Sequence, residues 1–254
     1  MRANAEHGPL RPQSQEIEEG RFPDTRWSLV AQAGSDLTVR QRALEVLCQA
    51  YWQPIYTFMR GRGRCKQDAE DLTQALLVSL ITREDFDGLS AEQGRFRSFL
   101  MKAASHFLSK DREFRLAQKR GGAVEHVSID SDAGESCFLQ LHGNGESPEV
   151  LFERQWAMQL LNRVMAALVE IYAREGKGEI FEHLRPMVAA NADRGDYAEL
   201  ATAIGVSEPS LRMMVFRMRK RYRSLLREEI AQTVADPSEI DDEINHLFRV
   251  FESG

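Results

Sequence analysis

The segment YAELATAIGVSEPSLRMMVFRMRKR, residues 197–221, carries the clearest fold signal in the chain. A small residue, Ala201, stands where two short helices would cross, and Gly205 four positions later suits a turn that needs a positive φ. Leu211 follows as the buried aliphatic residue of the second helix, and Ser207 suits the N-cap of that helix. The spacing predicts a helix-turn-helix.

The second helix of this unit has two chemically different faces. At about 100° per residue, the apolar residues fall on one line and the basic residues on the opposite side. The packing face comprises Leu211, Met214, Val215, Met218, Tyr222 and Leu225; the other comprises Arg212, Met213, Phe216, Arg217, Lys220 and Arg223. Such a basic face suits the DNA major groove, where arginine bonds guanine and a phenyl ring touches a thymine methyl. The alternative is a helical hairpin whose arginines are only solvated.

Charge is distributed unevenly along the chain. The formal net charge is −6, yet residues 209–227 hold seven basic residues and no acid. Residues 95–120 hold eight basic residues against two acids, whereas residues 228–254 hold eight acids against Arg249 alone. Two basic segments far apart in an otherwise acidic chain indicate two separate contacts with a polyanion.

Helical periodicity extends through most of the remaining sequence. Apolar residues recur at spacings of three and four from Leu37 to the glycines at 61 and 63, again over residues 66–82, and again over residues 93–119. Ser147 followed by Pro148 predicts the start of a further helix, which Gly176 would end. Strand signals are confined to weak alternation over residues 124–129. We therefore expect an all-α chain.

Two further segments carry a family resemblance. DAEDLTQALLVSLI (68–81) is similar to the polymerase-binding helix of the sigma-70 family, and VSEPSLRMMVFRMRKRYRSLL (206–226) resembles its −35-reading region. FRSFLMKAASHFLSKDRE (96–113) falls where the family places −10 recognition and strand opening. The resemblance, over about residues 22–250, is to the extracytoplasmic-function group of RNA polymerase sigma factors. It implies a cytoplasmic factor that binds core RNA polymerase and promoter DNA and directs transcription initiation.

The resemblance and the faces of the helices assign roles to three sets of residues. The −35 contacts would be Ser207, Glu208, Ser210, Arg212, Met213, Phe216, Arg217, Arg219, Lys220 and Arg223. The −10 contacts would be Lys102, Ser105, His106, Ser109, Lys110, Arg112 and Arg115. Core polymerase would be bound by Asp68, Glu70, Asp71, Leu72 and Gln74. Phe99 and Phe107 suit either core packing or stacking with flipped bases.

The same interpretation divides the chain into five parts. We expect a disordered segment at 1–21, a sigma region 2-like domain at 22–120, an acidic glycine-rich linker at 121–147, a sigma region 4-like domain at 148–235 and an acidic amphipathic helix at 236–254. The linker either mimics RNA charge in the polymerase channel or acts as a spacer. The last helix either packs on its own −35 domain or works as an acidic clamp. In it, Ile240, Ile244, Leu247, Phe248 and Phe251 form the apolar stripe, with Asp241, Asp242 and Glu243 outside.

Other classes of function find less support. The sequence lacks a glycine-rich phosphate loop and the usual hydrolase and metalloprotease motifs, so we expect no enzyme activity, cofactor or metal. No apolar run is long enough for a membrane span, and three cysteines without metal-ligand spacing indicate reduced thiols. A stand-alone helix-turn-helix regulator is the first alternative and a helical protein-interaction scaffold the second. An anti-sigma protein or another regulator would be a further partner.

Overall fold

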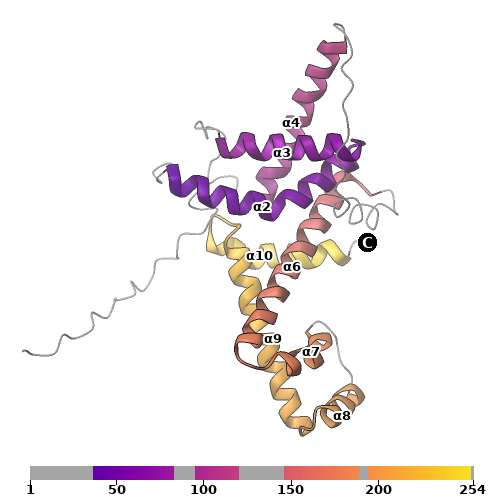
Figure 1. Ribbon diagram of the computed structural model, residues 1–254, viewed down its shortest axis with the longest axis vertical. Helices are drawn as coiled ribbons and strands as arrows, with labels where there is room; N and C mark the ends of the chain where they lie inside the picture. The colour runs from indigo at the N-terminus through magenta and orange to yellow at the C-terminus, as the bar shows by residue number, and fades with distance from the viewer. Residues whose placement is uncertain (1–36, 83–94, 120–145, 189–193, 253–254) are drawn as a thin grey trace, which may run out of the picture.

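The structure is a computed structural model that describes residues 37–82, 95–119, 146–188 and 194–252 (Figure 1). Within these ranges every regular element is helical, and Arg95 and Val234 form an isolated antiparallel bridge. The all-α class is therefore confirmed for the described part of the chain. The predicted tail at 1–21, linker residues 121–145 and the weak strand signal at 124–129 lie outside the described residues.

The helices match the periodic segments of the sequence closely. In chain order they are α2 (Leu37–Gly61), α3 (Lys66–Thr82), α4 (Phe96–Lys119), α6 (Pro148–Arg174), α7 (Gly178–Leu184), η3 (Arg185–Met187), α8 (Arg194–Ala203), α9 (Glu208–Ala231), η4 (Pro237–Glu239) and α10 (Ile240–Glu252). Gly63 has a φ of +80° just after α2, and Gly176 has a φ of +68° just after α6. Both lie in the left-handed region that glycine adopts at little cost, so both helices end where the glycines predict.

The predicted start of α6 is also confirmed. Ser147 is its N-cap, and the serine hydroxyl accepts a hydrogen bond from the Val150 amide at 3.4 Å. Pro148 occupies the first turn, where its missing amide proton costs no helical hydrogen bond. The 27 residues of α6 make it the longest described helix, and it runs beside α9 through the middle of the molecule (Figure 1).

Apolar side chains gather in two clusters joined by α6 and α9. The first contains the buried faces of α2, α3 and α4 with Leu151, Trp156 and Leu160 of α6, and it continues to the end of α9 and into α10. The second contains the last turns of α6, helices α7 and α8, η3 and the first half of α9. Tyr222 and Leu225 of α9 touch both clusters. Helices α6 and α9 thus each contribute one half to each cluster.

The boundary between the two apolar clusters does not coincide with the predicted boundary between domains. The clusters meet within α6 and α9. The sequence predicts a division at 121–147, but the N-terminal half of α6 packs on α2, and Gly61 comes so close to α6 that an added Cβ would lie 3.1 Å from the Cα of Pro148. The division into domains at 22–120 and 148–235 stays a prediction. What the structure shows is one continuous first core that takes material from both sides of that division.

The C-terminal helix α10 corrects one sequence expectation. Ile240 and Leu247 are buried as expected, but Phe248 and Phe251 are 49% and 42% exposed. Glu243, expected outside the apolar stripe, is only 1% exposed. The reason is that α10 lies across α6 and α9 and brings Glu243 against two arginines at the start of α4. An ion pair, rather than apolar character, draws that carboxylate inward.

Candidate nucleic-acid interface

Helices α8 and α9 and the turn between them contain the residues from which the sequence predicts a helix-turn-helix. Ala201 is 4% exposed at the helix contact, and Leu211 is fully buried. Gly205 has a φ of +70°, and the Val206 amide closes the end of α8 by donating to the Ala201 carbonyl at 3.0 Å. The Ser207 hydroxyl then caps α9 by accepting from the Ser210 amide at 3.4 Å. The turn is therefore fixed by backbone bonds and a side-chain cap.

The two faces of α9 also differ as predicted. Leu211, Val215 and Met218 are buried in the second cluster. The residues on the opposite side are all exposed, namely Arg212, Met213, Phe216, Arg217, Lys220 and Arg223. Phe216 is 62% exposed and Met213 is 50% exposed. Large apolar side chains at such exposure between cations have the composition of a surface that contacts base edges and thymine methyl groups.

Arg212 is held in place by two neighbours. Its Nε and one terminal nitrogen lie 2.9 and 2.6 Å from the same carboxylate oxygen of Glu208, one helical turn earlier. The guanidinium carbon lies 4.4 Å from the centre of the Tyr197 ring on α8. Stacking on a ring leaves the edges of a guanidinium available for hydrogen bonds. Glu208 therefore positions the guanidinium group of Arg212. Its own predicted contact with DNA is a separate role.

Arg219 lies differently from the other predicted −35 residues. Its Nε donates to the carbonyl of Met187 in η3 at 2.9 Å, and its side chain is half-buried. Arg221 points to another side of α9 and pairs with Glu175, which follows α6. The structure thus gives Arg219 a bond that ties η3 to α9. Arg212, Val215, Phe216, Lys220, Arg223, Tyr197 and Arg219 line a shallow hollow between α8 and α9.

The predicted −10 residues lie along α4. Lys102, His106, Ser109, Lys110 and Arg112 are exposed, and Ser105 is half-buried. Arg115 belongs to the same helix but lies outside the residues whose side chains are described. Phe99 and Phe107 are half-buried and pack on the first cluster, which favours core packing for both rings.

Phe114, for which the sequence predicts no role, is the aromatic residue that α4 exposes. Its side chain is 62% exposed, one turn beyond Lys110. An exposed ring beside a cation provides a stacking surface for a base. Helical spacing puts Phe114 on the same side of α4 as Phe107, seven positions earlier, so the sequence pattern does not mark it as exposed. It is exposed because the far end of α4 extends beyond the other helices of the first cluster (Figure 1).

The first turn of α4 contains a buried ionic cluster that sequence reasoning missed. Arg97 donates to Glu243 of α10 through Nε at 2.5 Å and to Glu153 of α6 through a terminal nitrogen at 2.5 Å. Arg95 adds a contact to Glu243 at 3.1 Å, and His246 lies 3.0 Å from Glu153. The Phe96 amide donates to the Thr233 carbonyl at 3.0 Å. These contacts join the start of α4 to α6, α10 and the segment before η4.

The predicted polymerase-binding residues lie on α3 with different exposures. Asp71 and Gln74 are exposed, while Asp68 and Glu70 are half-buried. Leu72 is only 6% exposed and packs in the first cluster. Its side chain therefore supports the helix from within, and surface contacts on α3 come from the polar residues around it. An acidic first turn also suits the helix dipole.

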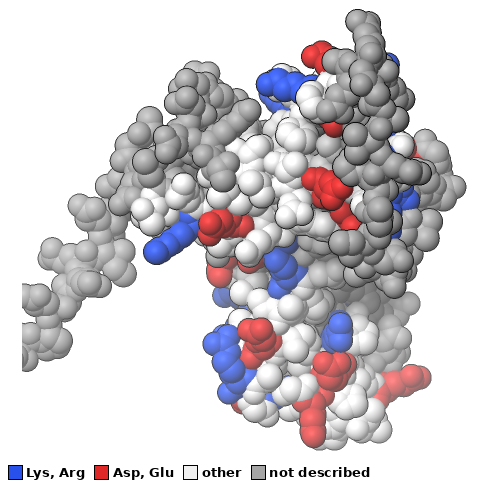
Figure 2. Space-filling view, turned by 45° about the horizontal axis from the view of Figure 1, so that its top comes forward, with Lys and Arg blue, Asp and Glu red and all other residues white. Residues whose placement is uncertain are grey.

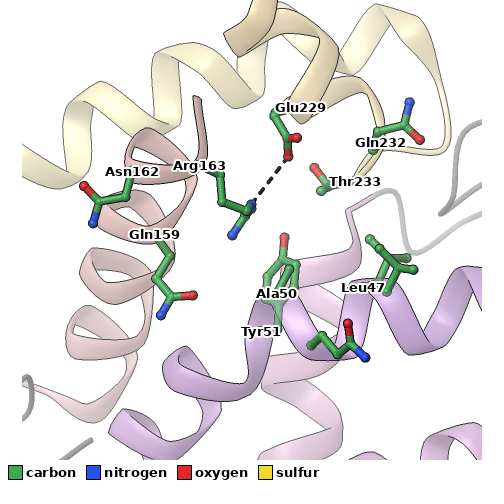
Figure 3. Close-up of a pocket in the computed structure, with 11 residues that line it drawn as sticks. Leu47, Ala50, Tyr51, Gln159, Asn162, Arg163, Glu229, Gln232 and Thr233 are labelled. Carbon is green, nitrogen blue, oxygen red and sulfur yellow. Dashed lines mark hydrogen bonds and ion pairs between the residues drawn. The ribbon is translucent and has the colours of Figure 1, made fainter. Parts of the chain in front are cut away.

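A polar cavity of about 480 Å³ lies at the junction of α2, α6 and α9. Figure 3 shows Tyr51, Arg163, Glu229 and Thr233 around it, with Arg163 Nε 3.5 Å from Glu229. The Tyr51 hydroxyl accepts a hydrogen bond from the Trp156 indole nitrogen at 3.0 Å. Burial, and then the charge of Glu243, raise the pKa of Tyr51 above its ordinary value of 10.0. The phenol thus stays protonated and bridges α2 to α6.

Comparison with known proteins identifies no relative. No protein-family model matches the chain, and neither a curated protein nor a solved structure matches it. The described residues contain no group of three or more His, Cys, Asp or Glu side chains that could hold a metal ion. Among the same residues, no helix has the length and apolarity needed to cross a membrane.

The exposed basic residues of α4 and α9 form two separate surfaces. On the face that Figure 2 shows, lysine and arginine side chains stand beside aspartate and glutamate side chains. The exposed basic residues of α9 and those of α4 are separate, because α8 with the start of α9 and the far end of α4 lie at opposite ends of the long axis (Figure 1). The molecule thus presents two distant basic surfaces joined by α6 and α9.

Proposed function

We propose that the chain is an RNA polymerase sigma factor of the extracytoplasmic-function group, which binds core polymerase and directs promoter-specific transcription initiation. The observation that carries the proposal is the face of α9, where Arg212, Met213, Phe216 and Arg217 are exposed near the start of a capped helix that follows α8 after a short turn. A helix presented in this way reads base edges through its N-terminal residues.

The second basic surface supports the same proposal. Cations, hydroxyls and an exposed ring on α4 suit a single strand whose bases have left the stack. Two recognition surfaces at opposite ends of one molecule suit two promoter boxes separated along the DNA (Figure 1). The exposed Asp71 and Gln74 of α3 would contact the polymerase, and the factor would act through binding energy without covalent chemistry.

Two other functions remain as alternatives. A stand-alone helix-turn-helix regulator would use α9 but would leave the polar face of α3 and the basic surface of α4 without a role. A helical scaffold that binds only proteins would leave the cations of α9 without one. Association with core polymerase separates the sigma factor from both, and we expect it to take place in the cytoplasm.

The deciding experiment is run-off transcription with bacterial core polymerase on a pool of random promoter templates, with and without the protein. Enrichment of two boxes at a fixed spacing is the expected result. A variant with Arg212, Phe216 and Arg217 replaced by alanine should lose the upstream box but retain polymerase binding. Arg174→Ala, which removes an exposed cation at the end of α6, is the matched control.

The other outcomes have definite meanings. Failure to bind core polymerase would refute the sigma factor proposal and favour the stand-alone regulator if the protein still bound specific DNA. Binding of neither polymerase nor DNA would favour the scaffold. Polymerase binding without enriched templates would indicate control by an anti-sigma protein or another regulator. The same assay with residues 236–254 removed would test whether α10 works as a clamp, provided that the shortened protein still unfolds cooperatively, because Ile240 and Leu247 belong to the first cluster.

A further inference from the structure

The turn between α2 and α3 faces the middle of α4 across an open surface cavity of about 420 Å³. The residues that line it are Arg62, Arg64, Ser105, Leu108, Ser109 and Arg112. Three arginines and two serines therefore line one open pocket, and its lining residues include no carboxylate. The helical pattern of the sequence marks Arg62 and Arg64 only as part of a break between helices.

The turn that carries Arg62 and Arg64 is fixed by its backbone. The Arg62 amide donates to Phe58 at 3.0 Å, the Gly63 amide to Arg60 at 2.9 Å, and the Arg64 amide to Met59 at 3.3 Å. Gly63 supplies the positive φ that this helix end needs. The two arginines are thus presented at set positions beside α4.

The cations exceed the carboxylates that neutralise them. Arg64 lies 2.9 Å from Asp111, and Arg62 pairs with Glu149 at the start of α6 while its guanidinium carbon lies 5.1 Å from the Phe58 ring centre. Arg112 is an additional, exposed cation. The pair of Arg62 and Glu149 is more than two-fifths exposed on both sides, and such exposed pairs contribute little free energy. An anion with more acceptor oxygens can therefore compete for these guanidinium groups.

We propose that this cavity binds phosphate, and that its ligand is a backbone phosphate of nucleic acid next to the strand held by α4. Guanidinium groups match phosphate in a two-pronged geometry, and serine hydroxyls supply further donors. Ser105, Ser109 and Arg112 belong to the predicted −10 surface, so the cavity is continuous with it. That the phosphate belongs to promoter DNA rests on the proposed function. That the cavity binds a phosphate group rests only on the residues that line it.

The test uses the full-length protein and the double variant Arg62→Ala/Arg64→Ala, with Arg174→Ala as the matched control. Affinity for promoter DNA with core polymerase, and for duplex DNA without it, is measured at several salt concentrations. The double variant should bind every sequence about three- to tenfold more weakly with unchanged base preference. The slope of log affinity against log salt should fall by about 0.7 to 0.9 for each phosphate that the variant no longer neutralises.

Two further variants keep the test decisive if the double variant folds poorly. Arg112→Ala removes an exposed cation and should show the same uniform weakening. Glu149→Gln removes the carboxylate that competes for Arg62 and should strengthen DNA binding, an effect that damage to the fold does not produce. Unchanged affinity and salt slope in all these variants would overturn the proposal.

A parallel titration with inorganic phosphate and with a nucleoside triphosphate identifies the source of the phosphate. Saturable binding of the free compounds that Arg62→Ala/Arg64→Ala abolishes, with unchanged DNA affinity, would keep the phosphate site and refute the nucleic-acid backbone. If the wild type failed to bind core polymerase while the variants still bound duplex DNA more weakly, the sigma factor proposal would fail and the phosphate site would stand.

Discussion

The first turn of α4 and the exposed face of α9 hold arginines in opposite ways. At α4, Arg97 is 5% exposed and bonds two carboxylates from α10 and α6. On α9, Arg217 and its basic neighbours are exposed, and the partner of Arg212 is Glu208 of the same helix, whose side chain is 42% exposed. Both segments are strongly basic in sequence. Net charge therefore does not distinguish a structural arginine from one that can meet a polyanion.

The largest expected effect comes from removing Arg97. Arg97→Ala leaves the buried Glu243 without its closest partner, and truncating one side of a buried pair costs about 3–5 kcal/mol of unfolding free energy. Urea unfolding followed by circular dichroism measures this. The combined variant Arg97→Met/Glu243→Leu should recover part of that stability, because it removes both charges of the closest pair while Glu153 keeps its contact with His246. A loss of less than about 1 kcal/mol of unfolding free energy in Arg97→Ala would mean that the ion pairs at the start of α4 stabilise the fold no more than exposed pairs on α9 do.

Arg212 tests the other side of the comparison through DNA rather than stability. On the proposed function, Arg212→Ala should cost about 1–3 kcal/mol at one base position of the upstream box, because alanine cannot replace a two-pronged hydrogen bond from arginine to guanine. Binding of polymerase holoenzyme to promoter variants measures it. Equal weakening on every sequence would show a phosphate contact instead. Glu208→Gln, which leaves Arg212 in place without its carboxylate partner, separates positioning from contact.

Alkaline pH should lower the free energy of unfolding through two buried groups of α2, Tyr51 and Cys48. Burial raises the pKa of Tyr51 above 10.0 and that of Cys48 from 9.0 to about 12. The folded state keeps both protons while the unfolded chain loses them, so stability is intact below pH 9 and falls as pH rises above 9 and then above 10. Each group contributes up to about 1.4 kcal/mol per pH unit in its window.

Urea unfolding at pH 8, 9, 10 and 10.5 checks this alkaline destabilisation. Cys48→Ala should remove the part that begins near pH 9 and leave the part that begins near pH 10. The comparison is made as a change with pH within each protein, because the substitution also alters packing in α2. A flat profile in the wild type would contradict burial of either group.

The smallest expected effect is that of Arg217 on folding. Because its side chain is exposed, Arg217→Ala should change the unfolding free energy by less than about 0.5 kcal/mol. The same variant should lower the salt dependence of DNA binding, since fewer counterions are released. A destabilisation near that of Arg97→Ala would show that Arg217 supports the fold as Arg97 does.

Much of the fold follows from local signals in the sequence. The end of α2 at Gly61, the cap of α6 at Ser147 and the turn at Gly205 all depend on residues within a few positions of one another. The exposed and buried faces of α9 depend on helical periodicity alone. The assignments of α9 to the −35 box, α4 to the −10 box and α3 to polymerase stay predictions.

Three features were decided by the tertiary structure. Arg97 and Glu243 are 146 positions apart, Arg62 and Glu149 are 87 apart, and Trp156 and Tyr51 are 105 apart. No local spacing relates such residues, because their contact depends on how α6, α9 and α10 pack on α2 and α4. The amino-acid sequence thus determined which segments are helical and which faces are polar. Only packing decided which charged side chains are buried in ion pairs and which are exposed and can bind a ligand.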